Sequence, residues 1–126
     1  MNTSEHDHQK SVINWAEVKS GEYPELRLLY AIPNGGHRHK AVAAKLKAEG
    51  VKPGVPDLCL PVPRGTHHGL YIELKPQWHG IKRRRRPIPS DEQLWWLKEL
   101  ADQGFDTYCC HGAAAAITVI MSYLNQ

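Results

Sequence analysis

Two short segments constrain the fold of this chain more than any other feature. The first is Pro56-Asp57-Leu58, and the second is Ile72-Glu73-Leu74-Lys75. Each has the composition of a β-strand, in which successive side chains point to opposite faces. Glu73 and Lys75 are therefore expected on one face, while the apolar residues between them point into the core. A hairpin that joins the two strands would bring Asp57 beside them.

The same residues carry the chemistry that hydrolysis of a phosphodiester requires. Mg²⁺ prefers carboxylate and carbonyl oxygens, and one or two carboxylates plus water often hold it. Asp57 and Glu73 are candidate ligands, and the backbone carbonyl of Leu74 is a third. Lys75 would hold the attacking water or neutralise charge in the transition state. Because two neighbouring carboxylates repel each other unless a cation separates them, the pattern favours a metal site.

Each of these residues also has an ordinary structural interpretation. Asp57 could cap a turn after the preceding proline. Glu73 and Lys75 could form an exposed ion pair on an edge strand, which contributes little to stability. The catalytic interpretation therefore depends on the three residues acting together, and on the motifs around them.

The hydrophobic pattern predicts an α/β fold, with a mixed sheet flanked by helices in the order α-β-α-β-β-α-β-α. At 126 residues, the chain is expected to form one domain, residues 1–126. The predicted helices span residues 4–19, 37–49, 90–103 and 112–124. The predicted strands span residues 26–32, a segment that begins at 57, residues 70–75 and residues 105–110.

Local signals mark the ends and the buried faces of these helices. Gly50 is the expected C-cap of the second helix, and Ser90 with Gln93 matches a capping box at the start of the third. Glu5 continues the apolar stripe of the first helix backwards, so an acid is expected on its inner face. The inward side chains are predicted to be Val12, Ile13 and Ala16 in the first helix, Ala43, Ala44 and Leu46 in the second, and Leu94, Leu97, Leu100 and Ala101 in the third.

Positive charge is concentrated in one polar loop, at about residues 76–89, although the net charge is only +3. A run of like charges is often simply solvated, but a basic loop beside an active site would contact backbone phosphate. The helix that follows Gly36 could also bind a phosphate at its N-terminus. The candidate nucleic-acid-binding residues are Lys82, Arg83, Arg84, Arg85, Arg86, Asn34, Arg38 and Lys40.

Other features narrow the class of protein. Residues 1–10 are polar and show no signal-peptide pattern, and the longest apolar stretch is too short to cross a bilayer. The three cysteines have no CxxC spacing, and no Cys or His set has the spacing of a structural zinc site. We therefore expect a cytoplasmic protein without disulfides.

The ordered set of motifs resembles the VRR-NUC domain family of the PD-(D/E)XK nuclease superfamily. The resemblance rests on Gly54-Val55-Pro56-Asp57-Leu58, on Tyr71-Ile72-Glu73-Leu74-Lys75, and on Gln93 in a helix entered through Ser90. Further matching features are Asn34-Gly35-Gly36 after a strand, Glu49-Gly50-Val51 before the Asp57 loop, and Trp96, Leu100 and Gly104 after Gln93. Together they cover nearly the whole chain.

The resemblance implies roles for particular residues. Asp57 and Glu73 would be metal ligands, Lys75 the catalytic lysine, and Gln93 an active-site residue. Glu5 matches the acidic residue expected on the first helix of the family, as a further ligand. The cofactor would be Mg²⁺ or Mn²⁺, and the basic residues would bind DNA.

Standalone, virus-type members of the family are similar in length to this chain. They are associated with homodimers that cut branched DNA, in particular four-way (Holliday) junctions, which makes this activity the leading expectation. The closest rival is a less selective endonuclease that acts on duplex or flapped DNA. Two further interpretations are a DNA-binding module without catalysis and a subunit that is active only in a larger complex. The basic loop is longer than the family pattern suggests.

Overall fold

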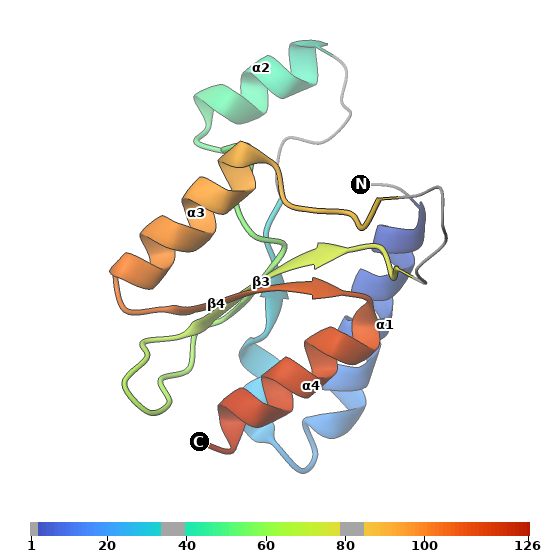
Figure 1. Cartoon of the computed structure of the whole chain (residues 1–126), viewed down its shortest axis with the longest axis vertical. Coiled ribbons are helices and arrows are strands. Elements are labelled where there is room, and N and C mark those ends of the chain that lie inside the picture. Colours follow the sequence, from blue (N-terminus) through green and yellow to red (C-terminus); the bar gives the residue numbers. More distant parts are fainter. Residues whose placement is uncertain (1–2, 34–39, 79–84) are drawn as a thin grey trace.

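The computed structural model describes residues 3–33, 40–78 and 85–126. The elements along the chain are α1 (Thr3–Lys19), the 3₁₀ helix η1 (Pro24–Leu28), β1 (Tyr30–Ala31), α2 (Lys40–Ala48), β2 (Leu58–Leu60), β3 (Leu70–Lys75), α3 (Asp91–Asp102), β4 (Asp106–His111) and α4 (Ala113–Leu124). This confirms the predicted α/β class with a mixed sheet between helices (Figure 1).

The sheet has the strand order β1-β2-β3-β4. The pairs β1–β2 and β2–β3 are antiparallel, so β2 and β3 form the predicted hairpin. The pair β3–β4 is parallel, in a register that runs from Leu70 opposite Asp106 to Lys75 opposite His111. A parallel pair needs a crossover connection, and α3 provides it. Consequently, the strands β3 and β4 end side by side after Lys75 and His111.

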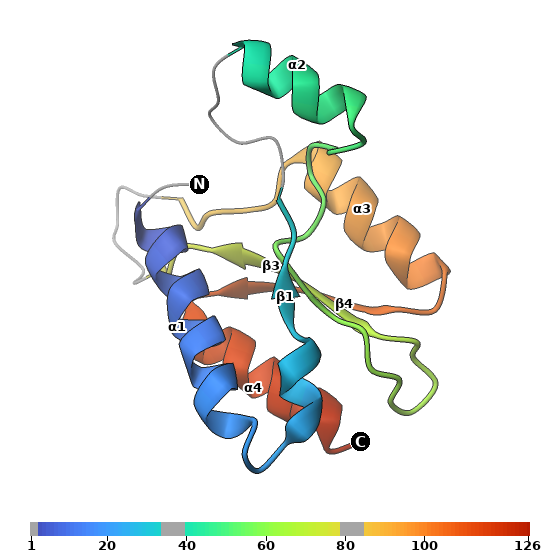
Figure 2. The ribbon, with the colours of Figure 1, turned by 180° about the vertical axis from the view of Figure 1, so that it is seen from behind.

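The helices divide between the two faces of the sheet. Val12 and Ala16 of α1 lie in one buried cluster with Ile72 and Leu74 of β3, together with residues of α4. Their spacing of four residues places them on one stripe of the helix, as predicted. Figures 1 and 2 show α1 and α4 side by side and away from α3. Because side chains of β3 alternate, Glu73 points to the other face, toward α3.

The predicted strand over residues 26–32 is wrong at its start. Residues 24–28 form η1, and the strand that follows contains only Tyr30 and Ala31, both exposed. Pro24 explains the difference, because its fixed φ and missing N–H suit the first turn of a helix. Leu26 is buried as predicted, but it reaches the core from a helical turn.

The second helix ends as predicted but is not buried as predicted. Gly50 has a φ of 97°, and the amides of Gly50 and Val51 bond to the carbonyls of Lys47 and Leu46, which is a Schellman cap. However, α2 has no buried residue: Ala44 is exposed, and Leu46 is only half-buried, as is Ala43. The rest of the protein therefore covers little of α2, which projects from one end of the molecule (Figure 1).

The third helix is also rotated from the predicted orientation. Leu94 is 50% exposed and Ala101 is exposed, whereas Leu97 and Leu100 are half-buried. The half-buried stripe also includes Gln93 and Trp96. Trp96 explains the orientation, because its indole N–H donates to the Pro53 carbonyl at 3.1 Å and holds the helix against the loop that leads to β2.

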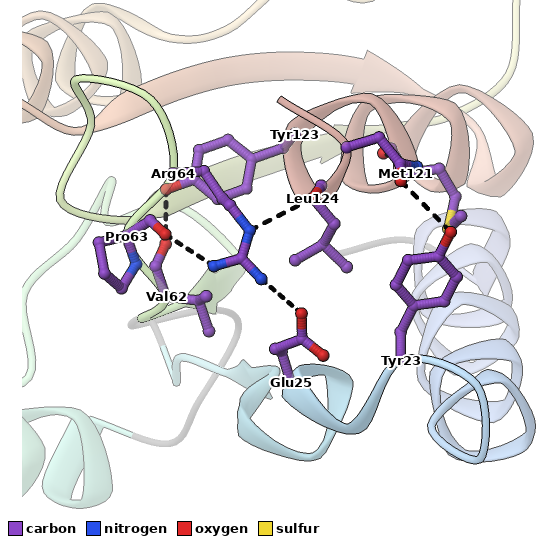
Figure 3. Close-up of polar contacts among 9 residues, drawn as sticks. Tyr23, Glu25, Val62, Pro63, Arg64, Met121, Tyr123 and Leu124 are labelled. Carbon is purple, nitrogen blue, oxygen red and sulfur yellow. Dashed lines mark hydrogen bonds and ion pairs between the residues drawn. The ribbon is translucent and has the colours of Figure 1, made fainter.

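One group of polar contacts joins η1, the β2–β3 hairpin and α4 (Figure 3). Arg64 pairs with Glu25 and donates to the backbone oxygens of Pro63 and Leu124, at 2.8 and 3.2 Å. The hydroxyl of Tyr123 donates to the Val62 carbonyl at 2.6 Å. We call these residues the Arg64 cluster. It connects segments that are far apart in the sequence, and so fixes the C-terminal helix to the hairpin.

Across the three ranges that the structure describes, no helix combines the length and the apolar character that crossing a membrane requires.

Candidate active site

Asp57 enters the sheet from a loop that packs against the start of α3. Gly54 in this loop has a φ of 85°, and a Cβ atom there would come within 2.9 Å of the Glu92 backbone. Only glycine fits this close approach without strain. The loop thus brings the start of β2 near the N-terminus of α3, which carries Gln93. Asp57 and Gln93 therefore reach the same region of the sheet from different directions.

The Asp57 carboxylate is buried and bonded to β3. It is only 3% exposed, and its Oδ2 accepts a hydrogen bond from the backbone N–H of Leu74 at 2.7 Å. Because Leu74 follows Glu73 directly, this bond holds the two carboxyl groups beside each other. The prediction that a hairpin brings Asp57 beside Glu73 is therefore confirmed. That the Leu74 carbonyl binds a metal ion stays a prediction.

Gln93 connects Glu73 to Lys75. Its Nε2 donates to Glu73 Oε1 at 2.6 Å, and its Oε1 accepts from Lys75 Nζ at 2.8 Å. The same Oε1 accepts from the Ser90 amide at 2.8 Å, which completes the predicted capping box. One side chain thus caps the start of α3 and holds two candidate catalytic groups. The two roles considered for Gln93 are both compatible with its position.

Glu73 is held at only one of its two oxygens within the part of the chain that the structure describes. The residue is 2% exposed, and Lys75 Nζ lies 3.9 Å from its Oε1. Its Oε2 is buried and has no hydrogen-bond partner among the described residues. A buried carboxylate oxygen without a donor is costly when it is ionised. Its position therefore suits a bound cation.

The environment of the two carboxyls opposes their ionisation. Burial raises the pKa of Glu73 to about 8, and the charge of Asp57 adds to the effect. Burial also raises the pKa of Asp57, against the Leu74 N–H bond, which lowers it. The charge of Glu5, in the first turn of α1, raises both pKa values further. The structure therefore brings Glu5 into the electrostatic range of the pair, as the sequence predicts.

These groups fit a hard divalent cation. Mg²⁺ needs only one or two protein carboxylates, because water and phosphate complete its coordination. Within the described residues, no three His, Cys, Asp or Glu side chains converge as a closed set of ligands. Among these residues, Glu5 is therefore not grouped with Asp57 and Glu73 as a third ligand. The cation would fit here because Asp57 and Glu73 are adjacent and buried, and because Glu73 Oε2 has no hydrogen-bond partner among the described residues.

Two residues of β4 also belong to this face of the sheet, and sequence reasoning missed both. Cys109 lies opposite Glu73, and His111 lies opposite Lys75. Burial raises the pKa of the Cys109 thiol, with a further contribution from Glu73, while Lys75 and Arg86 act against it. Alternation along residues 106–111 would have identified this face, had the pairing of β4 with β3 been known.

Only part of the predicted DNA-binding set can be placed. Arg85, Arg86 and Lys40 are exposed, and Arg86 is close enough to affect the Cys109 thiol. The remaining candidates lie outside the described residues: Asn34, Arg38, Lys82, Arg83 and Arg84.

Comparisons with known proteins agree with this fold. The model of the VRR-NUC domain family matches residues 3–114. A solved structure described as a VRR_NUC domain protein superposes with a TM-score of 0.77 at 29% identity, over 99% of this chain and 91% of that chain. A comparison with curated proteins gives no match.

The fold and the family match define a protein of the nuclease class that processes DNA. More specifically, the chain belongs to the VRR-NUC domain family. The predicted resemblance is confirmed.

Proposed function

We propose that this protein is a Mg²⁺- or Mn²⁺-dependent endonuclease that hydrolyses phosphodiester bonds in branched DNA, four-way junctions in particular. The observation that carries the proposal is the buried Asp57–Glu73 pair, with Lys75 and Gln93 bonded beside it. A structural role alone would not require two adjacent buried acids with raised pKa values.

The chain's own residues would divide the work as follows. Asp57 and Glu73 would hold the cation, with the Leu74 carbonyl and Glu5 as further ligands. When bound, the cation supplies a Lewis acid and activates water. Lys75 would orient the attacking water or neutralise charge at phosphorus. Gln93 would keep Lys75 and Glu73 in position through its two hydrogen bonds.

The preference for branched DNA follows from the resemblance to standalone, virus-type members of the family. A homodimer suits a four-way junction, because two-fold symmetry presents two active sites to two strands. The exposed arginines at the end of the basic loop would contact backbone phosphate. An endonuclease for ordinary duplex or flapped DNA uses the same site and is the second candidate.

A cleavage assay tests the proposal directly. A labelled four-way junction and a linear duplex of matched sequence are incubated with the protein in Mg²⁺, in Mn²⁺ and in EDTA. We expect metal-dependent cutting of the junction and little cutting of the duplex. Equal rates on both substrates would favour the less selective nuclease. An intact junction in both metals, with binding retained, would favour a binding module.

Substitution of the site residues gives the matching control. We expect Asp57→Ala and Lys75→Ala to lower the cleavage rate by at least about 10³-fold, because each removes a charge that acts in the transition state. Binding of the junction should remain largely intact. Exposed Lys98, which pairs with Asp102 on the outside of α3, provides a control as Lys98→Ala with a parental rate. Parental cleavage by both site variants would refute the assignment.

A further inference from the structure

His111 occupies a position at which the sheet meets the end of the basic loop. It is the last residue of β4 and lies opposite Lys75 in the parallel register. Residues opposite each other in neighbouring strands share a face, so His111 stands on the same face as Lys75 and Glu73. The chemistry proposed above does not use it. Its ring nevertheless contacts the loop through both of its nitrogens.

The two contacts of His111 specify a single form of the imidazole. Nε2 lies 2.6 Å from the carbonyl oxygen of Pro87, which can only accept, so Nε2 is assigned the proton. Nδ1 lies 3.3 Å from a terminal nitrogen of Arg86, which can only donate, so Nδ1 is assigned as the acceptor. The neutral ring with the proton on Nε2 satisfies both partners at once.

This pair of contacts fixes the direction of Arg86. Because Arg86 precedes a proline, its backbone is confined to extended conformations. The Pro87 carbonyl and the Arg86 guanidinium are then both held by one ring on a rigid strand. The Arg86 charge acts on the Cys109 thiol, whose raised pKa is due first to burial and next to Glu73. Because His111 lies opposite Lys75, the Arg86 guanidinium on its ring lies at the end of β3 and β4 that carries Lys75, while the residue as a whole remains exposed.

We propose that His111 is a positioning residue, which holds Arg86 beside the catalytic pocket so that Arg86 contacts a DNA phosphate next to the one that is cut. Arginine presents several donors in a planar fork, so one bond to His111 leaves others for a phosphate. A side chain that is ordered before binding loses less entropy when it binds. His111 would thus increase affinity without touching DNA. The proposal rests on the proposed function in that it takes DNA as the substrate.

A double-mutant cycle on DNA binding tests this coupling. Affinity for the four-way junction is measured in EDTA over a range of salt concentrations, for His111→Ala, Arg86→Ala and the double variant. Arg86→Ala should lower the affinity about tenfold and reduce the slope of log affinity against log salt by about 0.9, the contribution of one phosphate. His111→Ala leaves the Arg86 charge in place, so it should lower the affinity by a smaller factor. The double variant should be no weaker than Arg86→Ala, because His111 acts only through Arg86.

Arg85→Ala is the matched control. It removes the same charge one position earlier, and its effect should add fully to that of His111→Ala. His111→Gln provides the rescue, because its amide can donate to Pro87 and accept from Arg86, and it should restore most of the affinity. Additive effects of His111 and Arg86, or no rescue by glutamine in a folded variant, would show that His111 only supports the fold.

A spectroscopic measurement remains informative if His111→Ala does not fold. The ¹⁵N chemical shifts of the His111 ring should show the proton on Nε2, and Arg86→Ala should shift the Nδ1 signal. A proton on Nδ1, or an unchanged signal in Arg86→Ala, would overturn the proposal. Binding in EDTA also separates the two hypotheses. If the parent protein binds the junction but does not cut it, the proposed nuclease activity is wrong and the role of His111 in binding still stands. If the parent cuts in the presence of metal but the effects of His111→Ala and Arg86→Ala on binding are additive, only the proposed role of His111 is wrong.

Discussion

The Arg64 cluster holds half-buried charges and the Asp57–Glu73 pair holds buried ones, and only the first matches each charge with an opposite one. Arg64 pairs with Glu25, and its other nitrogens donate to backbone carbonyls. At the second site, the described residues bring one lysine, Lys75, to two buried acids, with the charge of Glu5 nearby. The Arg64 cluster thus supports the fold, whereas the acid pair carries an electrostatic cost that a further cation would remove.

The Arg64 cluster and the Asp57–Glu73 pair differ in how well their charges are matched, and not in whether every buried polar atom has a hydrogen bond. Next to the Arg64 cluster, the buried Nδ1 of His67 also has no partner within the described part of the chain. Burying a polar atom without a partner costs far less than burying an ionised carboxylate oxygen in the same situation. Unmatched charge, more than an unmatched polar atom, therefore distinguishes the candidate active site. Functional sites are where such a cost is expected to persist.

Breaking the Arg64 cluster should have the largest effect on stability. Arg64→Ala leaves the Glu25 carboxylate without its partner and removes two bonds to backbone oxygens. We expect a loss of about 2 kcal/mol in the free energy of unfolding, because a charged hydrogen bond between half-buried groups and two bonds to backbone oxygens are lost. Denaturant unfolding measures it. Cleavage per folded molecule should be unchanged, and a loss of catalytic rate in folded Arg64→Ala would remove the functional contrast between the clusters.

Gln93 should show a mixed effect, because it takes part in both a helix cap and the candidate site. Gln93→Ala removes one side of the capping box, which should cost about 1 kcal/mol. It also releases Lys75 and Glu73, and the cleavage rate should fall about 10–100-fold. Single-turnover kinetics and unfolding on the same sample separate the two effects. Ser90→Ala is the control, since it weakens the cap and should leave the rate nearly parental.

Tyr123→Phe should have the smallest effect. It deletes one hydroxyl, which donates to the Val62 carbonyl, and keeps the buried ring. We expect a loss of about 1 kcal/mol in unfolding free energy, with no change in the rate of cleavage. Thermal unfolding monitored by circular dichroism is sufficient. A fall in rate without a fall in stability would show that the two regions communicate.

Much of the fold follows from local sequence signals. The capping residues Ser90 and Gly50, and the alternation along residues 70–75, predict elements that the structure contains. The prediction of a strand over residues 26–32 is wrong at its start, because this apolar run has the composition of a strand, whereas its first turn, after a proline, is helical. The orientation of the third helix fails because the tertiary bond from Trp96 to Pro53 decides which stripe faces the sheet.

The candidate site was predictable from the residues where one hairpin determines it. Proximity of Asp57 to Glu73 follows from the hairpin. The capping box gives the place of Gln93 in the first turn of α3, whereas its role beside Glu73 is implied only by the family resemblance. Cys109 and His111 could not be found in this way, because their position depends on the parallel pairing of β4 with β3. Such pairing joins segments far apart in the sequence and leaves no local pattern.

The most direct test of the proposed cation site is the stability of the metal-free protein as a function of pH. Because the pKa of Glu73 is raised to about 8, the folded state holds a proton there that the unfolded state releases near pH 4.5. The parent should therefore lose stability between about pH 5 and 8, relative to Glu73→Gln, by up to about 5 kcal/mol, at roughly 1.4 kcal/mol for each pH unit.

Denaturant unfolding of both proteins, with and without Mg²⁺, measures this difference. We predict that Mg²⁺ restores the stability of the parent at pH 8 and has little effect on Glu73→Gln. Parallel pH profiles for the two proteins, together with no effect of Mg²⁺ on the parent, would contradict the claim that the buried acids are arranged for a cation.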